Sequence, residues 1–400
     1  MRKAGLIAAV AAIVLAGCNT VPGHAQPPLA AGQTSQAARE PLPAILHVHM
    51  VSASAGWALT GGAVLRTVDG GRTWTNVTPT SLLKTAHFVN LANQPWDRQA
   101  AFLNANTAWV VQFPTTAANA YRGVATGAMV YRTTDAGRSW SASSIKTTNE
   151  GGYLDVLNSS VGWLLTYGGA AAGSEGADLW ATTDGGGTWR KAAAADPVPH
   201  AASVGDLPFL GDKRGVLFTS AADGWVGVSD PKLGQATVYW TDSAGQRWVA
   251  AHPPVPSAYA SCNAFTGAPA GGWLVMPVNL ECGMPGPVIV FDRSEDAGET
   301  WTPGTALVST TGDGWVYSFA NFSVGLASDG KHLYRTGDGG GAWTLIHNAP
   351  TVATAVAKGI VVELDMLTPT VGWALVQEPG GVELLATTDA GQAWTNVGQS

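Results

Sequence analysis

Two histidines and two acids occupy alternate positions near opposite ends of this 400-residue sequence. One residue separates His47 from His49, and one residue separates Glu363 from Asp365. Residues two apart on a β-strand lie on the same side of it. Imidazoles and carboxylates bind metal ions when they converge. If the fold joins the two segments, these residues are a candidate channel cluster for a cation or polar ligand. The plainer alternative is the lining of a water-filled channel, and the sequence leaves the presence of a metal unknown.

No other set of residues selects a catalytic centre. A glycosidase needs two carboxylates about 5 to 10 Å apart, and no motif singles out such a pair. The sequence also lacks Gly-x-Ser-x-Gly, His-Glu-x-x-His and paired Cys-x-x-Cys motifs. We therefore expect no cofactor, assign no catalytic residue and leave open whether the chain is an enzyme.

A repeated turn supplies the framework for these residues. The pattern Ser/Thr-x-Asp-x-Gly-x-x-Trp occurs seven times, with Ser243 replacing the acid in the fourth copy. Asp favours a tight turn because its carboxylate accepts backbone N–H groups further along the chain, and Gly tolerates positive φ. The turn aspartates are Asp69, Asp135, Asp184, Asp296, Asp338 and Asp389.

The spacing of the turns predicts the fold class. A Gly-Trp pair or a close variant precedes each turn, and each unit reads as four short antiparallel strands. Repeats of about 40 to 65 residues indicate a solenoid or propeller. The sequence therefore predicts an all-β protein, a seven-bladed β-propeller of four-stranded antiparallel blades over residues 44–400. Ring closure would bring the first and last blades together, and with them the candidate channel cluster.

These turns resemble Asp-boxes, also called bacterial neuraminidase repeats. The combination of Gly-Trp-Ala-Leu with Arg-Thr-x-Asp-Gly-Gly-x-Thr-Trp resembles the photosystem II stability/assembly factor group, and sortilin-type domains and xyloglucan-hydrolysing enzymes share the box. The resemblance covers roughly residues 44–398 and implies a non-catalytic protein-binding or assembly scaffold. The alternative is a carbohydrate-active enzyme or glycan binder. A typical sialidase is disfavoured because no Arg-Ile-Pro motif occurs.

The amino terminus predicts export and lipid anchoring. Residues 1–17 combine a basic start with an apolar segment, as in a signal peptide. They end before Cys18 in Leu-Ala-Gly-Cys, which matches the lipobox of bacterial lipoproteins. Residues 18–43 are rich in Pro, Ala, Gln and Ser and suit a disordered tether. We expect a bacterial cell-envelope protein, anchored through acylated Cys18 and facing the periplasm or the exterior.

With Cys18 acylated, Cys262 and Cys282 are the cysteines left to pair after processing. Because exported proteins of diderm bacteria meet an oxidising compartment, we expect a disulfide between them, with two buried thiols as the alternative.

The length of the connections predicts where a partner binds. In a four-strand meander the Asp turns share one end of the sheets, the turn face, and the variable connections share the other end, the loop face. Loops presented by a rigid scaffold often carry function. Candidate partner-binding residues in these connections are Trp96, Arg98, Tyr121, Arg122, Arg214 and Trp315. The net charge of −7, without a basic stripe, argues against nucleic acid. We expect a monomer that binds a protein or a glycan.

Overall fold

The computed structural model describes residues 44–397 apart from 83–98, 114–126, 150, 172, 197–200, 202, 231, 233, 271–274, 284–285, 297, 313 and 347–358. The described residues belong to one compact unit, Leu42–Ser400. The predicted signal peptide, Cys18 and the tether lie outside them. The regular structure of the described residues is β-strand apart from one 3-10 helix, η1 (Ser257–Tyr259). Within this part of the chain, no helix is long and apolar enough to span a membrane.

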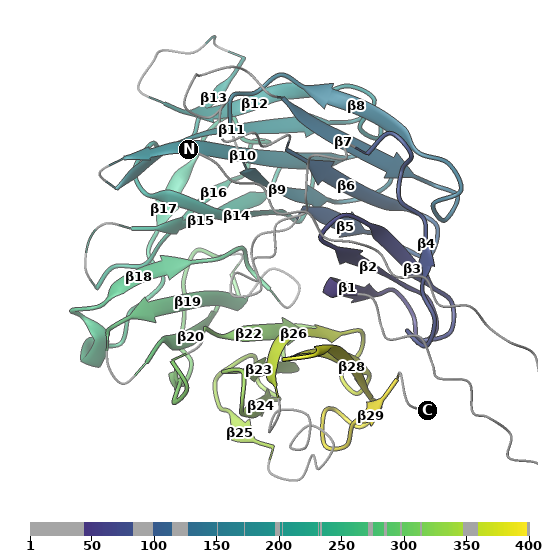
Figure 1. Cartoon of the computed structure of the whole chain (residues 1–400). Helices are drawn as coiled ribbons and strands as arrows, with labels where there is room; N and C mark the ends of the chain where they lie inside the picture. Colours follow the sequence, from purple (N-terminus) through teal and green to yellow (C-terminus); the bar gives the residue numbers. More distant parts are fainter. Residues whose placement is uncertain are drawn as a thin grey trace, which may run out of the picture. The chain divides into compact units, whose positions relative to one another are not determined.

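The strands form antiparallel meanders of four that follow one another along the chain (Figure 1). The first three are β1 (Ile45–Met50), β2 (Gly56–Thr60), β3 (Val64–Thr67) and β4 (Thr75–Asn76); β5 (Ala100–Phe102), β6 (Ala108–Gln112), β7 (Ala128–Thr133) and β8 (Ser141–Ile145); and β9 (Gly151–Val156), β10 (Gly162–Ala171), β11 (Ser174–Thr182) and β12 (Arg190–Ala195). The next two are β14 (Asp212–Phe218), β15 (Gly224–Ser229), β16 (Thr237–Thr241) and β17 (Val249–Ala251); and β18 (Asn263–Thr266), β19 (Val275–Glu281), β20 (Val288–Arg293) and β21 (Leu307–Val308). The last two are β22 (Val316–Phe319), β23 (Gly325–Ser328), β24 (Leu333–Thr336) and β25 (Thr344–Leu345); and β26 (Ile360–Met366), β27 (Gly372–Glu378), β28 (Gly381–Thr387) and β29 (Thr395–Asn396). The prediction of an all-β fold built from four-stranded antiparallel units is confirmed.

Two pairings extend beyond a single meander. The short strand β13 (Gly205–Asp206) adds a fifth strand to the third meander by pairing parallel to β12. The fourth and fifth meanders join into one eight-stranded sheet because Ser229 of β15 pairs with Phe265 of β18.

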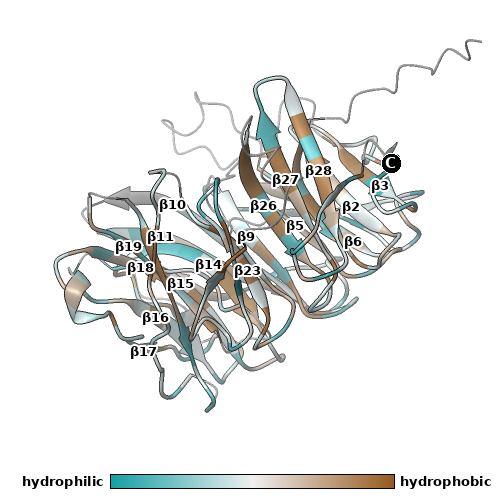
Figure 2. Ribbon diagram, turned by 90° about the horizontal axis from the view of Figure 1, so that it is seen from below, coloured by the Kyte–Doolittle hydropathy of each residue, from teal (hydrophilic) through white to brown (hydrophobic). Residues whose placement is uncertain are grey.

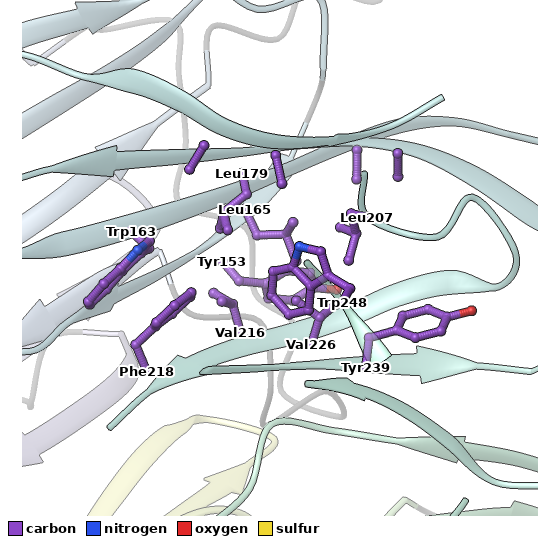
Figure 3. Close-up of a cluster of buried hydrophobic side chains, with 14 of the residues drawn as sticks. Tyr153, Trp163, Leu165, Leu179, Leu207, Val216, Phe218, Val226, Tyr239 and Trp248 are labelled. Atoms are coloured by element: carbon purple, nitrogen blue, oxygen red, sulfur yellow. The ribbon is translucent and has the colours of Figure 1, made fainter. Parts of the chain in front are cut away.

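Buried apolar side chains gather between consecutive meanders. Among the described residues there are seven such clusters, and each draws on two meanders that are neighbours in the chain or on the last and the first. Figure 2 shows the apolar stretches along the strands, β26 among them. Between the third and fourth meanders, Trp163 stacks on Phe218 with 3.9 Å between ring centroids (Figure 3). Between the last and the first, Leu384 packs with Val48 and Leu65.

The repeated turns are held by side-chain hydrogen bonds. In the third copy, Asp184 Oδ1 accepts the main-chain N–H of Thr188 at 2.9 Å and the hydroxyl of Thr182 at 2.8 Å. The other five aspartate turns repeat both contacts. In the fourth copy, Ser243 Oγ accepts only the N–H of Arg247 at 3.0 Å in the same manner, beside a contact with Thr241. The turn is therefore organised by the acid, and Ser243 is a weaker replacement.

The tryptophans and arginines of the repeat pack between sheets. Trp57 is fully buried, and its indole N–H donates to Asn104 of the next meander at 2.9 Å. Arg66 lies over the Trp57 ring and donates to the carbonyl of Ala105 at 3.1 Å. Arg132 makes the equivalent contacts with Trp109 and with Ser159 of the third meander. These residues have the structural role that their periodicity indicates.

Candidate functional site

The candidate channel cluster forms two histidine–carboxylate pairs between β1 and β26. His47 Nδ1 contacts a carboxylate oxygen of Glu363, and His49 Nδ1 lies 3.1 Å from Asp365 Oδ1. The second oxygen of each acid accepts a backbone N–H of β1, from Val48 at 2.9 Å and from Met50 at 2.6 Å. The structure therefore brings all four predicted residues together, as two separate bridges.

The same kind of bridge occurs between other sheets. Asp155 Oδ2 accepts the N–H of Phe218 in the next meander at 2.7 Å, and Ser318 Oγ accepts the N–H of Met366 at 2.9 Å. These acceptors share one position in the repeat. Asp155, Ser318 and Asp365 each lie eight residues before the residue that follows the glycine of the Gly-Trp pair, which is Trp163, Leu326 and Trp373 respectively. The carboxylates of β26 thus join sheets. Among the described residues there is no group of three or more His, Cys, Asp or Glu that could hold a metal ion, so the cation-binding version of the candidate channel cluster gains no support here and stays a hypothesis.

A buried lysine organises the loop face between the third and fourth meanders. The Lys213 ammonium donates to the carbonyl oxygens of Gly211 at 2.7 Å, Leu210 at 3.3 Å and Phe209 at 3.4 Å. Its main-chain N–H donates to the carboxylate of Glu175 at 2.7 Å. Burial lowers the pKa of Lys213 to about 8 and raises the pKa of Glu175. At neutral pH the ammonium is therefore a built-in cation that holds these carbonyls.

The residues that Lys213 holds expose apolar side chains. Phe209 is 37% exposed and Leu210 is 50% exposed. The Tyr239 hydroxyl donates to the Leu210 carbonyl at 3.1 Å, which fixes the loop from a second side. In Figure 3 the neighbouring Leu207 lies within the buried cluster. The loop is thus anchored at its ends and by its main chain, while Phe209 and Leu210 face solvent.

The predicted partner-binding residues have different positions. Arg214 is partly exposed at the start of β14, and its guanidinium lies 3.6 Å from Asp212 Oδ2. Trp315 is only 2% exposed, and its indole N–H donates to the carbonyl of Pro287 at 3.0 Å. Its assignment to a binding surface was wrong, because the side chain fills the apolar cluster between the fifth and sixth meanders. Trp96, Arg98, Tyr121 and Arg122 lie outside the described residues.

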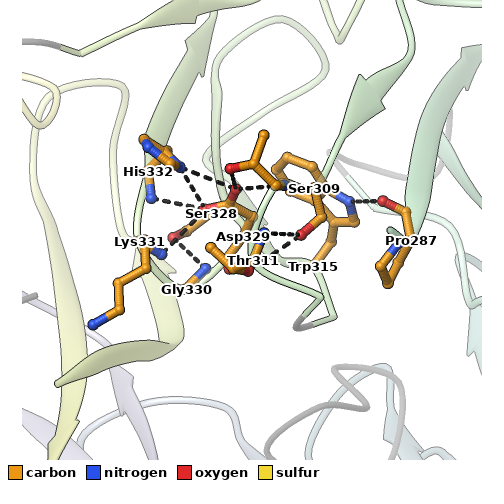
Figure 4. Close-up of polar contacts among 10 residues, drawn as sticks. Pro287, Ser309, Thr311, Trp315, Ser328, Asp329, Gly330, Lys331 and His332 are labelled. Atoms are coloured by element: carbon orange, nitrogen blue, oxygen red, sulfur yellow. Dashed lines mark hydrogen bonds and ion pairs between the residues drawn. The ribbon is translucent and has the colours of Figure 1, made fainter. Parts of the chain in front are cut away.

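A second polar cluster on the loop face was missed by sequence reasoning (Figure 4). The buried carboxylate of Asp329 accepts the N–H groups of Lys331 and His332 and lies 3.1 Å from His332 Nδ1. These hydrogen bonds help to lower the pKa of Asp329, although burial opposes them as the largest effect. The Thr311 hydroxyl donates to the Asp329 carbonyl at 2.7 Å, which joins the hairpin to the preceding connection. The Asp-Gly pair within Ser-Asp-Gly-Lys-His indicated the turn, but nothing local indicated the burial.

Asp292 is a further residue that sequence reasoning missed. It is fully buried in β20, and neither carboxylate oxygen makes a well-formed hydrogen bond to a residue that the structure describes, although the Gly304 N–H lies close enough to act on it. Burial raises its pKa to about 7, and the nearby Gly304 N–H lowers it only in part. Comparison of the repeats could have found it, because Leu65, Tyr131 and Leu385 occupy the same position relative to the turn.

The two cysteines of the fifth meander are bonded to each other. The Sγ atoms of Cys262 and Cys282 are 2.07 Å apart. The bond links the segment before β18 to the segment after β19, at the loop face.

No family model matches the sequence, and no curated protein is significantly similar to it. Many solved structures have a similar fold, and two of them are compared with this chain. One is YCF48 bound to D1 peptide, with a TM-score of 0.56 and 15% identity over 88% of this chain and 95% of that chain. The other is the GH74 xyloglucanase from Xanthomonas campestris, with a TM-score of 0.55 and 19% identity over 88% of this chain and 54% of that chain. At these identities the similarity shows the fold alone, and that fold is a β-propeller.

Proposed function

We propose that this protein is a lipid-anchored, non-catalytic scaffold that binds a protein partner through its loop face. In this proposal Cys18 carries the lipid, residues 18–43 are the tether, and the domain is a closed, monomeric ring of seven Asp-box blades outside the bacterial cytoplasm. The seven inter-sheet clusters support the ring, since one of them joins the last meander to the first. Trp96, Arg98, Tyr121, Arg122 and Arg214 are proposed to flank the binding surface.

The exposed Phe209–Leu210 pair carries the proposal. An exposed apolar side chain binds a partner with little entropic cost when its main chain is already ordered. Lys213 and Tyr239 provide that order through hydrogen bonds to the loop carbonyls. The similarity to a propeller solved with a bound peptide agrees with a polypeptide partner.

A glycan-binding or carbohydrate-active propeller is the second candidate, supported by the similarity to a xyloglucanase. The carboxylates of Asp155, Glu363 and Asp365 weigh against catalysis in the channel, because each already accepts a backbone N–H from a neighbouring sheet. The turn aspartates are likewise engaged in their turns.

The test compares two pairs of exposed apolar residues by chemical crosslinking and recovery from the native membrane. Phe209→Ser with Leu210→Ser should abolish recovery of a specific partner. Val68→Ser with Val249→Ser is the matched control, because both valines are exposed beside Asp turns on the turn face. If both double variants recover the partner equally well, the loop face is not where the partner binds. Binding to a polysaccharide panel, unaffected by the Phe209 and Leu210 changes, would favour the glycan reading.

The anchor is tested separately. Cys18→Ser should move the protein from the detergent phase to the aqueous phase, or leave its signal peptide uncut, because acyl chains provide the membrane affinity. Unchanged partitioning would contradict lipidation.

A further inference from the structure

The main chain before β14 turns three consecutive carbonyl oxygens toward one point. The carbonyl oxygens of Phe209, Leu210 and Gly211 lie 3.4, 3.3 and 2.7 Å from Lys213 Nζ. The carbonyl oxygen of Glu175, on β11, lies 3.5 Å from the same atom. Carbonyl oxygens carry partial negative charge, so they repel one another around a shared point unless a cation lies between them. Rings of such oxygens bind cations by replacing the hydration shell of the ion. The geometry is therefore that of a cation cage.

The backbone of this cage is held by groups other than the ammonium. The Gly211 N–H donates to the Gly173 carbonyl at 2.8 Å, and the Glu175 N–H donates to the Phe209 carbonyl at 3.4 Å. Gly211 has a φ of 77°, and a Cβ atom there would lie 2.2 Å from a methyl group of Val228. Only glycine suits that position. The chain itself thus directs the carbonyl oxygens inward, and the cage is a site in its own right.

Lys213 fills the cage with its own ammonium. The residue is 1% exposed. Burial opposes the charge and lowers the pKa of Lys213 to about 8, while the charges of Glu175 and Asp212 favour the ammonium. The group is therefore protonated at pH 7. An ammonium carries three N–H donors on a compact head, which suits several carbonyl acceptors at once. A neutral side chain of similar length supplies none of these donors.

We propose that the main-chain carbonyl oxygens of Glu175, Phe209, Leu210 and Gly211 form a monovalent-cation site, which the tethered ammonium of Lys213 occupies in place of a free ion. The ligand class is a primary ammonium. The site itself does not depend on the proposed function. Its consequence for partner binding rests on that function, because the cage fixes the main chain that presents Phe209 and Leu210.

The experiment removes the tethered cation and supplies a free one. Lys213→Ala lacks a propyl chain and an amine, and n-propylammonium chloride returns both. Tetramethylammonium chloride is the matched salt, since it carries the same charge without an N–H donor. Amide hydrogen exchange at Glu175 and Gly211 measures docking of the loop, because both N–H groups bridge the loop and the third meander. The full chain is used without any partner.

We expect Lys213→Ala to speed exchange at both amides about tenfold or more, because the carbonyl oxygens lose their shared donor. Added n-propylammonium should return the rates to those of the parent, and tetramethylammonium should leave them fast. Lys213→Met retains much of the side-chain volume without the charge. It should exchange as fast as Lys213→Ala and should not respond to n-propylammonium, because its own side chain fills the space.

Two results would overturn the cation site. One is exchange in Lys213→Met at the rate of the parent, which would show that packing alone holds the loop. The other is a folded Lys213→Ala that n-propylammonium fails to restore, or that tetramethylammonium restores equally well. Urea unfolding checks that each variant is folded, and Lys213→Met decides the outcome if Lys213→Ala is not.

Recovery of the partner separates this site from the proposed function. Lys213→Met should recover less partner than the parent does if Phe209 and Leu210 bind it. If Lys213→Met loosens both amides yet recovers the partner as the parent does, the cation site stands and binding through the Phe209–Leu210 pair is rejected.

Discussion

Replacing Asp292 by leucine should stabilise this protein, and the gain should depend on pH. Asp292 is fully buried, and neither of its carboxylate oxygens makes a well-formed hydrogen bond to a described residue. Burial raises its pKa from the ordinary value of 3.8 to about 7, and the Gly304 N–H opposes this only in part. The unfolded chain therefore releases this proton at lower pH than the folded chain does. The contribution of the Asp292 carboxyl to the free energy of unfolding is fully present below about pH 4. It falls as the pH rises toward 7 and is lost above that pH.

The difference of about three pKa units, at about 1.4 kcal/mol each, corresponds to about 4 kcal/mol. Residual solvation and relaxation reduce such values. We therefore expect the difference in unfolding free energy between Asp292→Leu and the parent to be larger at pH 7.5 than at pH 4.5, by about 2 to 4 kcal/mol. Leucine is suitable because Leu65 and Leu385 fill the same position in other repeats.

Urea unfolding at the two pH values measures the effect. The comparison between variant and parent cancels the titration of all other groups. A gain that is the same at pH 4.5 and pH 7.5 would refute the reasoning, because it would mean that Asp292 ionises in the folded protein without cost.

Three further predictions concern the turns and the disulfide. Hydrogen bonds from the turn lower the pKa of Asp135 and Asp184 to about 2. The stability that these carboxylates contribute is therefore present above about pH 4 and is lost as the pH falls toward 2. Melting temperatures measured over that range should fall less in Asp184→Ser than in the parent, and an equal fall would mean that the acid is dispensable. Ala136 has a φ of 66°, so Ala136→Gly should raise the free energy of unfolding by about 1 kcal/mol, whereas a loss in a urea titration would show that the left-handed turn is not strained. Without the disulfide, in Cys262→Ser with Cys282→Ser, the unfolded chain is no longer cross-linked across the separation of 20 residues, so the free energy of unfolding should fall by about 3 kcal/mol in the same titration. An unchanged midpoint would place the bond outside the cooperative unit.

Local chemistry explains the success of the sequence predictions. The Asp184 carboxylate organises its turn through contacts with Thr182 and Thr188, which lie within four residues of it. A pattern of eight residues therefore contains nearly all the atoms that form the turn. Repetition of this pattern, with a Gly-Trp strand ahead of it, was enough to predict the antiparallel four-stranded units.

Contacts between sheets explain where the site predictions failed. Trp315 looked like a surface aromatic because it lies in a variable connection, but the fifth meander covers it. Lys213 lies in the charged run Asp-Lys-Arg, where no local signal indicates that the carbonyls of Phe209, Leu210 and Gly211 surround its ammonium. Asp292 and Asp329 look like ordinary surface acids in the sequence, yet both are buried.

The sequence by itself determined the turns, the strands and the repeat, and it offered the hypothesis that His47 and His49 meet the acids of the last unit; the structure showed which histidine pairs with which acid. Only the tertiary structure decided which of these polar groups are used between sheets and which apolar groups face solvent. The physical reason is that burial depends on the neighbouring sheet, which can be hundreds of residues away, as Asp365 is from Met50. Turn formation depends on a few adjacent residues, whereas the exposure of Phe209 depends on how distant parts of the chain pack around its loop.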